Sequence, residues 1–282
     1  MVASIMHRVS QDPMQQNLEN SPPCDIWGDK LGKKSENTLC VSFQNINGFG
    51  YLKNGQKAEE IYDFIGAHEI DVCLLAEMNV NWRLVSKKNT IDDLTRGWFE
   101  NQRCVTSYNQ YDRSYMAYQP GGTAVITQGE MSLRCIKSGH DDKKMGRWSW
   151  QLLRGKHNLK LRVISLYFPS INNEYGKKKV YTQQQKALLQ QKRTETVWAA
   201  FWTNLFEFIE ECKKNGEQLV VGGDWNVDVR TPALKEKFEA YQLFPGVTGK
   251  HDAETAPETY SKGSKPIDEF FVSPTLEIQA AG

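Results

Sequence analysis

Residues 219–226 read Leu219-Val220-Val221-Gly222-Gly223-Asp224-Trp225-Asn226 and carry the clearest structural signal in the chain. Three apolar residues before a glycine pair are typical of a short strand that is covered on both faces. The glycines allow a sharp bend and leave room for a ligand to approach. Asp224 and Asn226 can then point to the same side and hold a water nucleophile and a phosphate oxygen together. The alternative is an ordinary Asx-turn, in which Asp224 accepts hydrogen bonds from its own loop.

The composition is that of a globular protein with a large core. The chain has 282 residues, of which 39% are apolar and 11% aromatic, enough for one large domain or two small ones. Lys and Arg number 35 and Asp and Glu 34, so net charge neither favours nor excludes a polyanionic partner. No apolar run approaches the ~18 residues of a membrane span, and residues 1–10 lack the apolar core of a secretory signal.

The cysteines indicate a reducing compartment. All six are widely scattered, no Cys-x-x-Cys motif occurs, and no His stands at ligand spacing from a Cys. This pattern argues against a zinc site and predicts buried, reduced thiols. We therefore expect an intracellular protein, nuclear or cytoplasmic, that is neither secreted nor membrane-bound.

Residues 1–36 and 37–282 differ in pattern. The first segment is rich in Gln, Asn, Ser, Pro and Lys without periodicity, which predicts a flexible lead-in. The second reads as one domain and opens with an alternating strand at 38–43 that ends near Asn45. A helix with one apolar face then precedes a buried strand that delivers Glu77. Such strand–helix–strand crossovers give parallel neighbouring strands.

The rest of the chain predicts a mixed sheet with long helices. Residues 79–120 are polar, aromatic and irregular, which favours a long excursion over one face. Strands are expected at 121–127, at 266–272, and as a hairpin at 147–153 and 159–167, with helices at 181–215 and around 232–241. The charges of residues 140–144 are expected in a solvated loop tip. Arg147 and Lys177–Lys179 are candidates for contacts with a nucleic-acid backbone, with a solvated surface as the alternative for the lysines.

Polar residues thus end three predicted strands, at Asn45, Glu77 and Asp224. The carboxyl ends of parallel strands are where sites form in α/β sheets. Together with Asn226, these residues and the strand-end Tyr167 and Asp268 form a set of oxygen donors without His or Cys. Such a set suits Mg²⁺ or Mn²⁺ bound jointly with a substrate phosphate.

The spacing Asp224-x-Asn226-x-Asp228 also copies the start of an EF-hand calcium loop. That loop requires Gly at its sixth position and a bidentate Glu at its twelfth, where this chain has Val229 and Lys235. Calcium binding of the EF-hand type is therefore excluded.

Four motifs in order resemble one known superfamily. They are Gln-Asn-Ile-Asn-Gly at 44–48, Leu-Leu-Ala-Glu at 74–77, Gly-Gly-Asp-Trp-Asn at 222–226 and Pro-Ile-Asp-Glu-Phe-Phe-Val-Ser at 266–273. The set is similar to the endonuclease/exonuclease/phosphatase (DNase I-like) superfamily, especially apurinic/apyrimidinic-type endonucleases and the endonuclease domains of non-LTR retrotransposons. The resemblance implies a four-layer α/β sandwich, with a two-sheet mixed β-sandwich flanked by helices. It also implies divalent-metal-dependent hydrolysis of phosphodiesters, with DNA as the expected partner.

The resemblance also implies roles for the residues that match its motifs. Glu77 would bind the metal ion, with Asn45 beside it. Asp224 would orient or deprotonate the attacking water, and Asn226 would donate a hydrogen bond to the phosphate. Tyr167 would contact a phosphate oxygen.

Asp268 would orient a histidine, and here the chain departs from the family pattern. The family's Ser-Asp-His motif does not occur before Gly282, and His251, in a polar loop, is a poor substitute. Met78 and Ser170 are two further, tolerable departures. We therefore expect a domain truncated at its C-terminus, with the last strand and this motif missing, and reduced hydrolytic activity.

Two other functions stay open at this point. One is a phosphatase of the same fold that acts on a phosphoinositide or another lipid-type headgroup. The other is a catalytically degenerate remnant that binds nucleic acid. No stable protein partner is inferred, and a retrotransposon-type polyprotein is one expected context.

Overall fold

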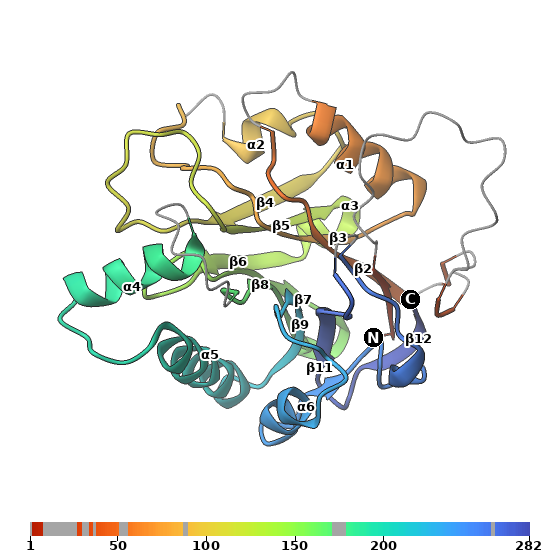
Figure 1. Ribbon diagram of the computed structural model, residues 1–282. Helices are drawn as coiled ribbons and strands as arrows, with labels where there is room; N and C mark the ends of the chain where they lie inside the picture. The colour runs from red at the N-terminus through yellow and green to blue at the C-terminus, as the bar shows by residue number, and fades with distance from the viewer. Residues whose placement is uncertain are drawn as a thin grey trace, which may run out of the picture.

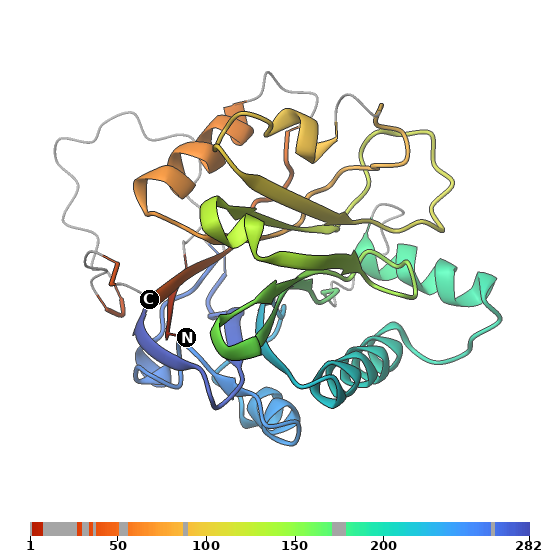
Figure 2. The same cartoon turned by 180° about the vertical axis from the view of Figure 1, so that it is seen from behind.

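Two six-stranded mixed sheets pack face to face, with helices on the outer face of each, so that the molecule has four layers (Figures 1 and 2). The computed structural model describes residues 2–7, 27–29, 34–35, 38–50, 56–86, 90–170, 179–260 and 263–282. This arrangement confirms the expected α/β sandwich. In the described ranges, no helix is both long and apolar enough to cross a bilayer.

The first sheet has the strand order β12-β1-β2-β3-β5-β4. Its strands are β1 (Val2–His7), β2 (Thr38–Asn45), β3 (Val72–Ala76), β4 (Gln102–Ser107), β5 (Thr123–Gln128) and β12 (Glu277–Ala281). Helix α1 (Gln56–Ala67) connects β2 to β3, and these strands are parallel, as the crossover predicts. The short helices α2 (Ile91–Leu94) and α3 (Gly129–Leu133) flank β4 and β5 in sequence.

The second sheet has the order β10-β11-β9-β8-β7-β6. Its strands are β6 (Cys135–His140), β7 (Trp148–Arg154), β8 (Lys160–Tyr167), β9 (Glu217–Asp224), β10 (Phe244–Pro245) and β11 (Asp268–Val272). Strands β8 and β9 are parallel and are connected through α4 (Val180–Gln190) and α5 (Val197–Lys214), whereas the other pairs are antiparallel. Helix α6 (Pro232–Glu239) follows β9, and short 3₁₀ turns lie at Lys156–Asn158 and Ala253–Thr255.

Strand β3 is buried on both faces because each face has its own partner layer. Leu74 contributes to the core between the sheets, and Leu75 to the cluster that includes Ile61 and Ile65 of α1. Strand β9 behaves in the same way, with Val220 towards the other sheet and Val221 in the cluster under α5. This two-sided burial explains why both strands read as unbroken apolar runs.

Gly222 does not leave room for a ligand, as was expected, but allows close packing between the sheets. A Cβ at this position would lie 2.6 Å from Phe270 and 2.8 Å from Leu74. The space beside it is therefore filled by the facing sheet and the neighbouring strand, and is not available to a ligand. The glycine lets β9 approach β3 closely, while the chain turns two residues after the strand, at Asn226, where φ is +50°.

The helix expected at 181–215 is two helices. It divides between Gln190 and Val197, where Lys192 has a φ of +58°. Thr196 caps the second helix, since its side chain accepts a hydrogen bond from the backbone of Ala199 at 3.2 Å. Large apolar residues recur at helical spacing from Trp198 to Cys212 in α5, and this strong pattern concealed the break in the sequence before it.

Five strands of the described ranges occur where none was expected, namely β1, β4, β6, β10 and β12. Residues 2–7, assigned to the flexible lead-in, form β1 and pair with β2 on one side and β12 on the other. Strand β12 follows β11, which corresponds to the strand that was expected at 266–272 as the last of the chain. Its outward-facing Glu277 and Gln279 make it read as a polar tail, which is typical of an edge strand.

The buried charges of the β6–β7 connection also correct the sequence analysis. Asp141, expected in a solvated loop tip, is fully buried and accepts two hydrogen bonds of 2.7 Å from Arg147. Arg147 also donates to Asn204 and the carbonyl of Ala200. It is therefore an internal cross-link and not a nucleic-acid contact. Lys177 and Lys178 lie outside the described residues.

Three of the five described thiols are buried, as the sequence predicts, whereas Cys104 and Cys135 are half-buried. Cys40, Cys73 and Cys212 are buried and free, and burial raises the pKa of each thiol to about 12. A thiol with such a pKa stays protonated at neutral pH and is a poor nucleophile.

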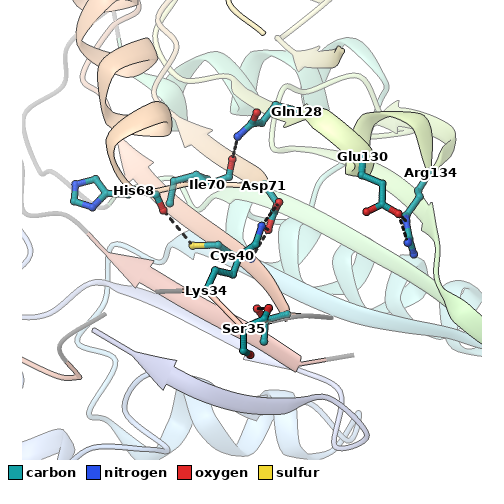
Figure 3. A network of polar contacts seen from close by, with 10 residues as sticks. Lys34, Ser35, Cys40, His68, Ile70, Asp71, Gln128, Glu130 and Arg134 are labelled. Atoms are coloured by element: carbon teal, nitrogen blue, oxygen red, sulfur yellow. Dashed lines mark hydrogen bonds and ion pairs between the residues drawn. The ribbon is translucent and has the colours of Figure 1, made fainter. Parts of the chain in front are cut away.

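A polar network fixes the register at the amino-terminal ends of β2 and β3 (Figure 3). Asp71 accepts from Lys34 at 2.7 and 2.9 Å and from the backbone of Cys40 at 2.7 Å. Gln128 donates to the carbonyl of Ile70 at 2.5 Å. Because these contacts lock one end of the strands, the residues at the other end are delivered opposite each other.

Candidate active site

The candidate site lies where β2, β3, β8 and β9 end. Asn45 is opposite Ala76 in the first sheet, and Glu77 comes next in the chain. In the second sheet, Asp224 pairs with Tyr167 on one side and with Asp268 on the other. The predicted site residues therefore come from the strand ends of two facing sheets.

A hydrogen bond between Asn45 and Asp224 joins the two halves. The side-chain nitrogen Nδ2 of Asn45 donates to Oδ2 of Asp224 at 2.7 Å. The Asn45 amide is oriented from behind, because its Oδ1 accepts from the backbone of Asn47 at 3.0 Å. The other oxygen of Asp224 accepts from the backbone of Asn226 at 2.9 Å, so the Asx-turn considered above is present within the site.

Trp225 anchors the turn that carries these side chains. Its ring is fully buried beside Phe238 and Phe271, and its Nε1 donates to the carbonyl of Glu269 at 3.1 Å. Because the Trp225 ring is held in the core, the backbone positions of its neighbours Asp224 and Asn226 are fixed as well. Asn226 also donates through Nδ2 to the carbonyl of Phe168 at 2.6 Å, which ties the turn to the end of β8.

Asp224 is under electrostatic stress. It is only 2% exposed, and burial raises the pKa of its carboxyl well above the usual range, followed by the nearby carboxylates of Asp268 and Glu77. The hydrogen bonds from Asn45 and Asn226 lower this pKa but do not reverse the shift. Clustered like charges of this kind destabilise a fold unless a cation is present.

Tyr167 lies against the same carboxylates. Its ring is buried, and burial, then Glu77 and Asp224, raises the pKa of its phenol well above the usual value. Polar interactions with Glu77 and Asn226 place the hydroxyl between two other predicted site residues. A phenol in this setting stays protonated and can donate a hydrogen bond.

Glu77 is held in an unusual backbone conformation. Its φ is +51°, in the left-handed region that few non-glycine residues adopt. The backbone N–H of Gly48 donates to the Glu77 carbonyl at 2.7 Å, and that of Phe49 donates to Met78 at 2.9 Å. These bonds fix the turn after β3 against the turn after β2, so that Glu77 and Asn45 lie on adjacent strand ends.

The oxygen donors suit a hard cation that keeps part of its hydration shell rather than one that is held by protein side chains alone. In the described ranges, no three His, Cys, Asp or Glu side chains are arranged to hold a metal ion by themselves. Mg²⁺ keeps several waters and takes one or two carboxylates together with substrate phosphate oxygens. The oxygen-only set around Glu77 and Asn45, with the strained acid Asp224 beside it, meets that requirement.

His251 lies away from this set. Its Nε2 is 2.8 Å from the carbonyl of Ala281 and 3.4 Å from Asp29, and its ring packs edge-on against Trp27. It therefore belongs to the β12 edge of the first sheet, and the partner histidine expected for Asp268 is not His251.

Sequence reasoning missed a tyrosine next to the site. Burial and then Glu77 raise the pKa of Tyr118, which lies in the excursion that was treated as irregular. Its neighbours Tyr115 and Met116 are also aromatic or apolar. This short cluster in an otherwise polar stretch is the signal that could have identified it.

The chain belongs to the Endonuclease/Exonuclease/phosphatase family, whose model matches residues 43–282. Proteins of this family include hydrolases of phosphate esters, so the strand-end carboxylates lie in a hydrolase fold. No curated sequence matches the chain significantly.

Solved structures support the same fold. An AP endonuclease from Leishmania major has a TM-score of 0.56 at 13% identity, covering 82% of this chain and 78% of its own. An AP endonuclease from Archaeoglobus fulgidus has a TM-score of 0.52 at 14% identity, covering 83% and 86%. A 3′ phosphatase from Neisseria, bound to a product DNA hairpin, has the same score, identity and coverage.

Proposed function

We propose that this protein is a divalent-metal-dependent phosphodiesterase that cuts nucleic acid, with DNA as the substrate and internal cleavage as the reaction. The observation that carries the proposal is the convergence of acids from two sheets, joined by the 2.7 Å bond between Asn45 and Asp224. The proposal is supported by the family match and by structural neighbours whose names describe AP endonucleases and a DNA-bound phosphatase.

In this proposal Glu77 and Asn45 hold Mg²⁺ or Mn²⁺. The bound cation would supply charge stabilisation and positioning of the phosphate. Asp224 orients the attacking water and accepts its proton, which a buried carboxylate with a raised pKa does readily. Asn45 keeps one oxygen of Asp224 in place, so that the other faces the turn.

Two neutral donors complete the proposed chemistry. Asn226 and Tyr167 donate hydrogen bonds to phosphate oxygens as negative charge builds up on them. Neither residue adds charge to the site before the substrate arrives. Asp268 raises the pKa of Asp224 and is therefore proposed to tune the base.

A phosphomonoesterase is the second candidate, because one structural neighbour is described as a 3′ phosphatase. The donor set would serve either reaction, since both place one phosphate against the same groups. A retrotransposon-type context, in which the domain nicks a target site, stays a hypothesis that the parent gene would test.

Parallel assays separate these functions. The protein is incubated with supercoiled plasmid, with a 3′-phosphorylated oligonucleotide and with a phosphoinositide headgroup, in Mg²⁺, in Mn²⁺ or in EDTA. We expect nicking of the plasmid with metal, and Glu77→Gln to reduce it roughly 10²–10³-fold. Glu130→Gln is the control, because Glu130 pairs with Arg134 on α3 near the other end of the sheet (Figure 3). Nicking by Glu77→Gln at the wild-type rate would contradict the proposal.

A further inference from the structure

We propose that the loop at residues 108–119, called the Tyr115 loop here, binds unpaired bases of a nucleic acid beside the scissile phosphate. The ligand is a single strand or a locally opened duplex. The inference rests on the proposed function, because it concerns recognition at the same site. In both ribbon views the loop lies on the same side of the molecule as α4, away from the two termini (Figures 1 and 2).

The loop exposes large apolar side chains that serve no core. Tyr115 is 92% exposed, Met116 60% and Tyr118 49%. Single exposed apolar residues are common, but three within four positions form a patch that indicates an interaction site. The exposed arginines Arg83 and Arg113 accompany this patch.

The loop is held rigidly by the segment that follows Glu77. The backbone of Asn81 donates to the carbonyl of Ala117 at 2.8 Å, and its side chain donates to Met116 at 3.3 Å. Arg83 donates to the carbonyl of Ser114 at 2.8 Å. These bonds fix the backbone on both sides of Tyr115.

A second set of bonds closes the base of the loop. Gln119 accepts from the backbone of Asn109 at 2.8 Å and donates to its carbonyl at 2.9 Å. Asp112 accepts from Gln183 of α4 at 3.2 Å. A surface ordered in this way loses little conformational freedom on binding, which favours affinity.

The same bonds place the patch next to the acids. Val80 and Tyr118 form a bridge, and Asn79 exchanges hydrogen bonds of 2.8 Å with Gly121. Glu77, three residues before Val80, is close enough to raise the pKa of Tyr118. The loop is therefore within reach of nucleotides that flank a phosphate bound at Glu77.

Unpaired bases fit this surface better than other ligands. Aromatic rings stack on base faces of any sequence, and arginine contacts the phosphates between them. In an intact duplex the base faces are covered by their neighbours, so exposed rings would find only sugars and edges. Because the net charge is only +1, overall electrostatic attraction to a nucleic acid is small, and affinity depends on such short-range contacts.

Binding in EDTA tests the inference without requiring catalysis. The anisotropy of a fluorescein-labelled 12-nucleotide single strand is compared with that of the matching duplex for the wild type, Tyr115→Ala and Tyr115→Ala/Met116→Ala. Loss of one stack should weaken single-strand binding roughly 5- to 150-fold, with a smaller effect on the duplex. Tyr115→Trp should restore binding, because it keeps the ring.

Leu133→Ala is the matched control, since Leu133 is 68% exposed on α3 and belongs neither to the candidate active site nor to the Tyr115 loop. Unchanged single-strand binding by the double variant, with an unchanged melting temperature, would overturn the inference. Equal losses of affinity for the single strand and the duplex would also overturn it. If binding to anionic lipid vesicles is measured in parallel, a loss of affinity confined to the vesicles would do the same. Hydrolysis of bis(p-nitrophenyl) phosphate with Mg²⁺ is measured separately: no hydrolysis contradicts the proposed function, whereas hydrolysis with unaltered binding contradicts only the role of the loop.

Discussion

Replacing Asp224 with asparagine should stabilise the metal-free protein while removing most of its activity. The carboxylate is 2% exposed and lies near the acids Asp268 and Glu77, which with burial raise its pKa well above the usual range. Each unit of such a shift costs the folded state about 1.4 kcal/mol once the carboxyl is ionised. Asparagine has nearly the same shape and carries no charge.

The substitution has an opposing cost. Asp224 accepts hydrogen bonds from Asn45 and from the backbone of Asn226, and asparagine can accept only through one oxygen. Losing one such bond costs about 0.5–1.5 kcal/mol. Burial and the neighbouring acids, which raise the pKa of Asp224, penalise its ionised form at neutral pH. We expect relief of this penalty to outweigh the lost hydrogen bond, so that the net effect is stabilising. For a domain of this size we expect about 2–4 °C in melting temperature for each kcal/mol.

The pH dependence has a definite sign. A carboxyl whose folded pKa is raised binds more protons when folded, so the wild type loses stability as pH rises above the unfolded value of 3.8. Below that pH both states are protonated and the penalty disappears. The advantage of Asp224→Asn should therefore be absent near pH 4 and grow with pH. Urea unfolding in EDTA at several pH values measures it.

Added Mg²⁺ and activity provide the second half of the test. The cation should stabilise the wild type more than Asp224→Asn, because it neutralises a charge that the variant lacks. The rate of plasmid nicking should fall roughly 10²–10⁴-fold with loss of the proposed base. A variant that is less stable than the wild type at pH 8 in EDTA, or whose stability difference does not depend on pH, would refute the reasoning.

Three further outcomes follow from single contacts. Tyr167→Phe should lower the nicking rate roughly 10-fold or more. Because burial and two carboxylates raise the pKa of Tyr167, ionisation of its phenol should not reduce the wild-type rate below pH ~10. Arg147→Met leaves Asp141 buried without its partner and should cost about 3–5 kcal/mol in urea unfolding, whereas a change below 1 kcal/mol would mean that water reaches the acid. Gly222→Ala places a methyl 2.6 Å from Phe270 and should cost about 1–3 kcal/mol, with Gly216→Ala as a comparison that meets no neighbouring atom but has a φ of +71°.

The central strands could be predicted from the sequence because they are buried on both faces. β3 and β9 read as apolar runs for this reason. The strands at the sheet edges could not be predicted, since their outward residues are polar and their pattern depends on which neighbour covers them. β4 and β6 are partly exposed along their length, and β4 was hidden in the irregular excursion.

The site was predictable only as a set of strand ends. Asn45, Glu77 and Asp224 follow apolar runs, and the chain topology then brings those ends together. Partners across the fold left no local signal. Arg147 looked like a surface cation, because nothing in its neighbourhood says that Asn204, far along the chain, would meet it inside.

The contacts that hold the sheets together are largely separate from the acids of the site. Buried hydrogen bonds cross between the sheets from Thr123 to Ser149 at 2.9 Å and from Thr127 to Gln151 at 2.7 Å. Ser165 donates to the carbonyl of Leu75 at 2.8 Å. Together with the Asp71 network, these bonds fix the strand ends whether or not Asp224 is charged. The framework can therefore hold the carboxylates close together despite their repulsion. A bound cation would relieve this repulsion, and the anionic phosphate would then bind against the cation.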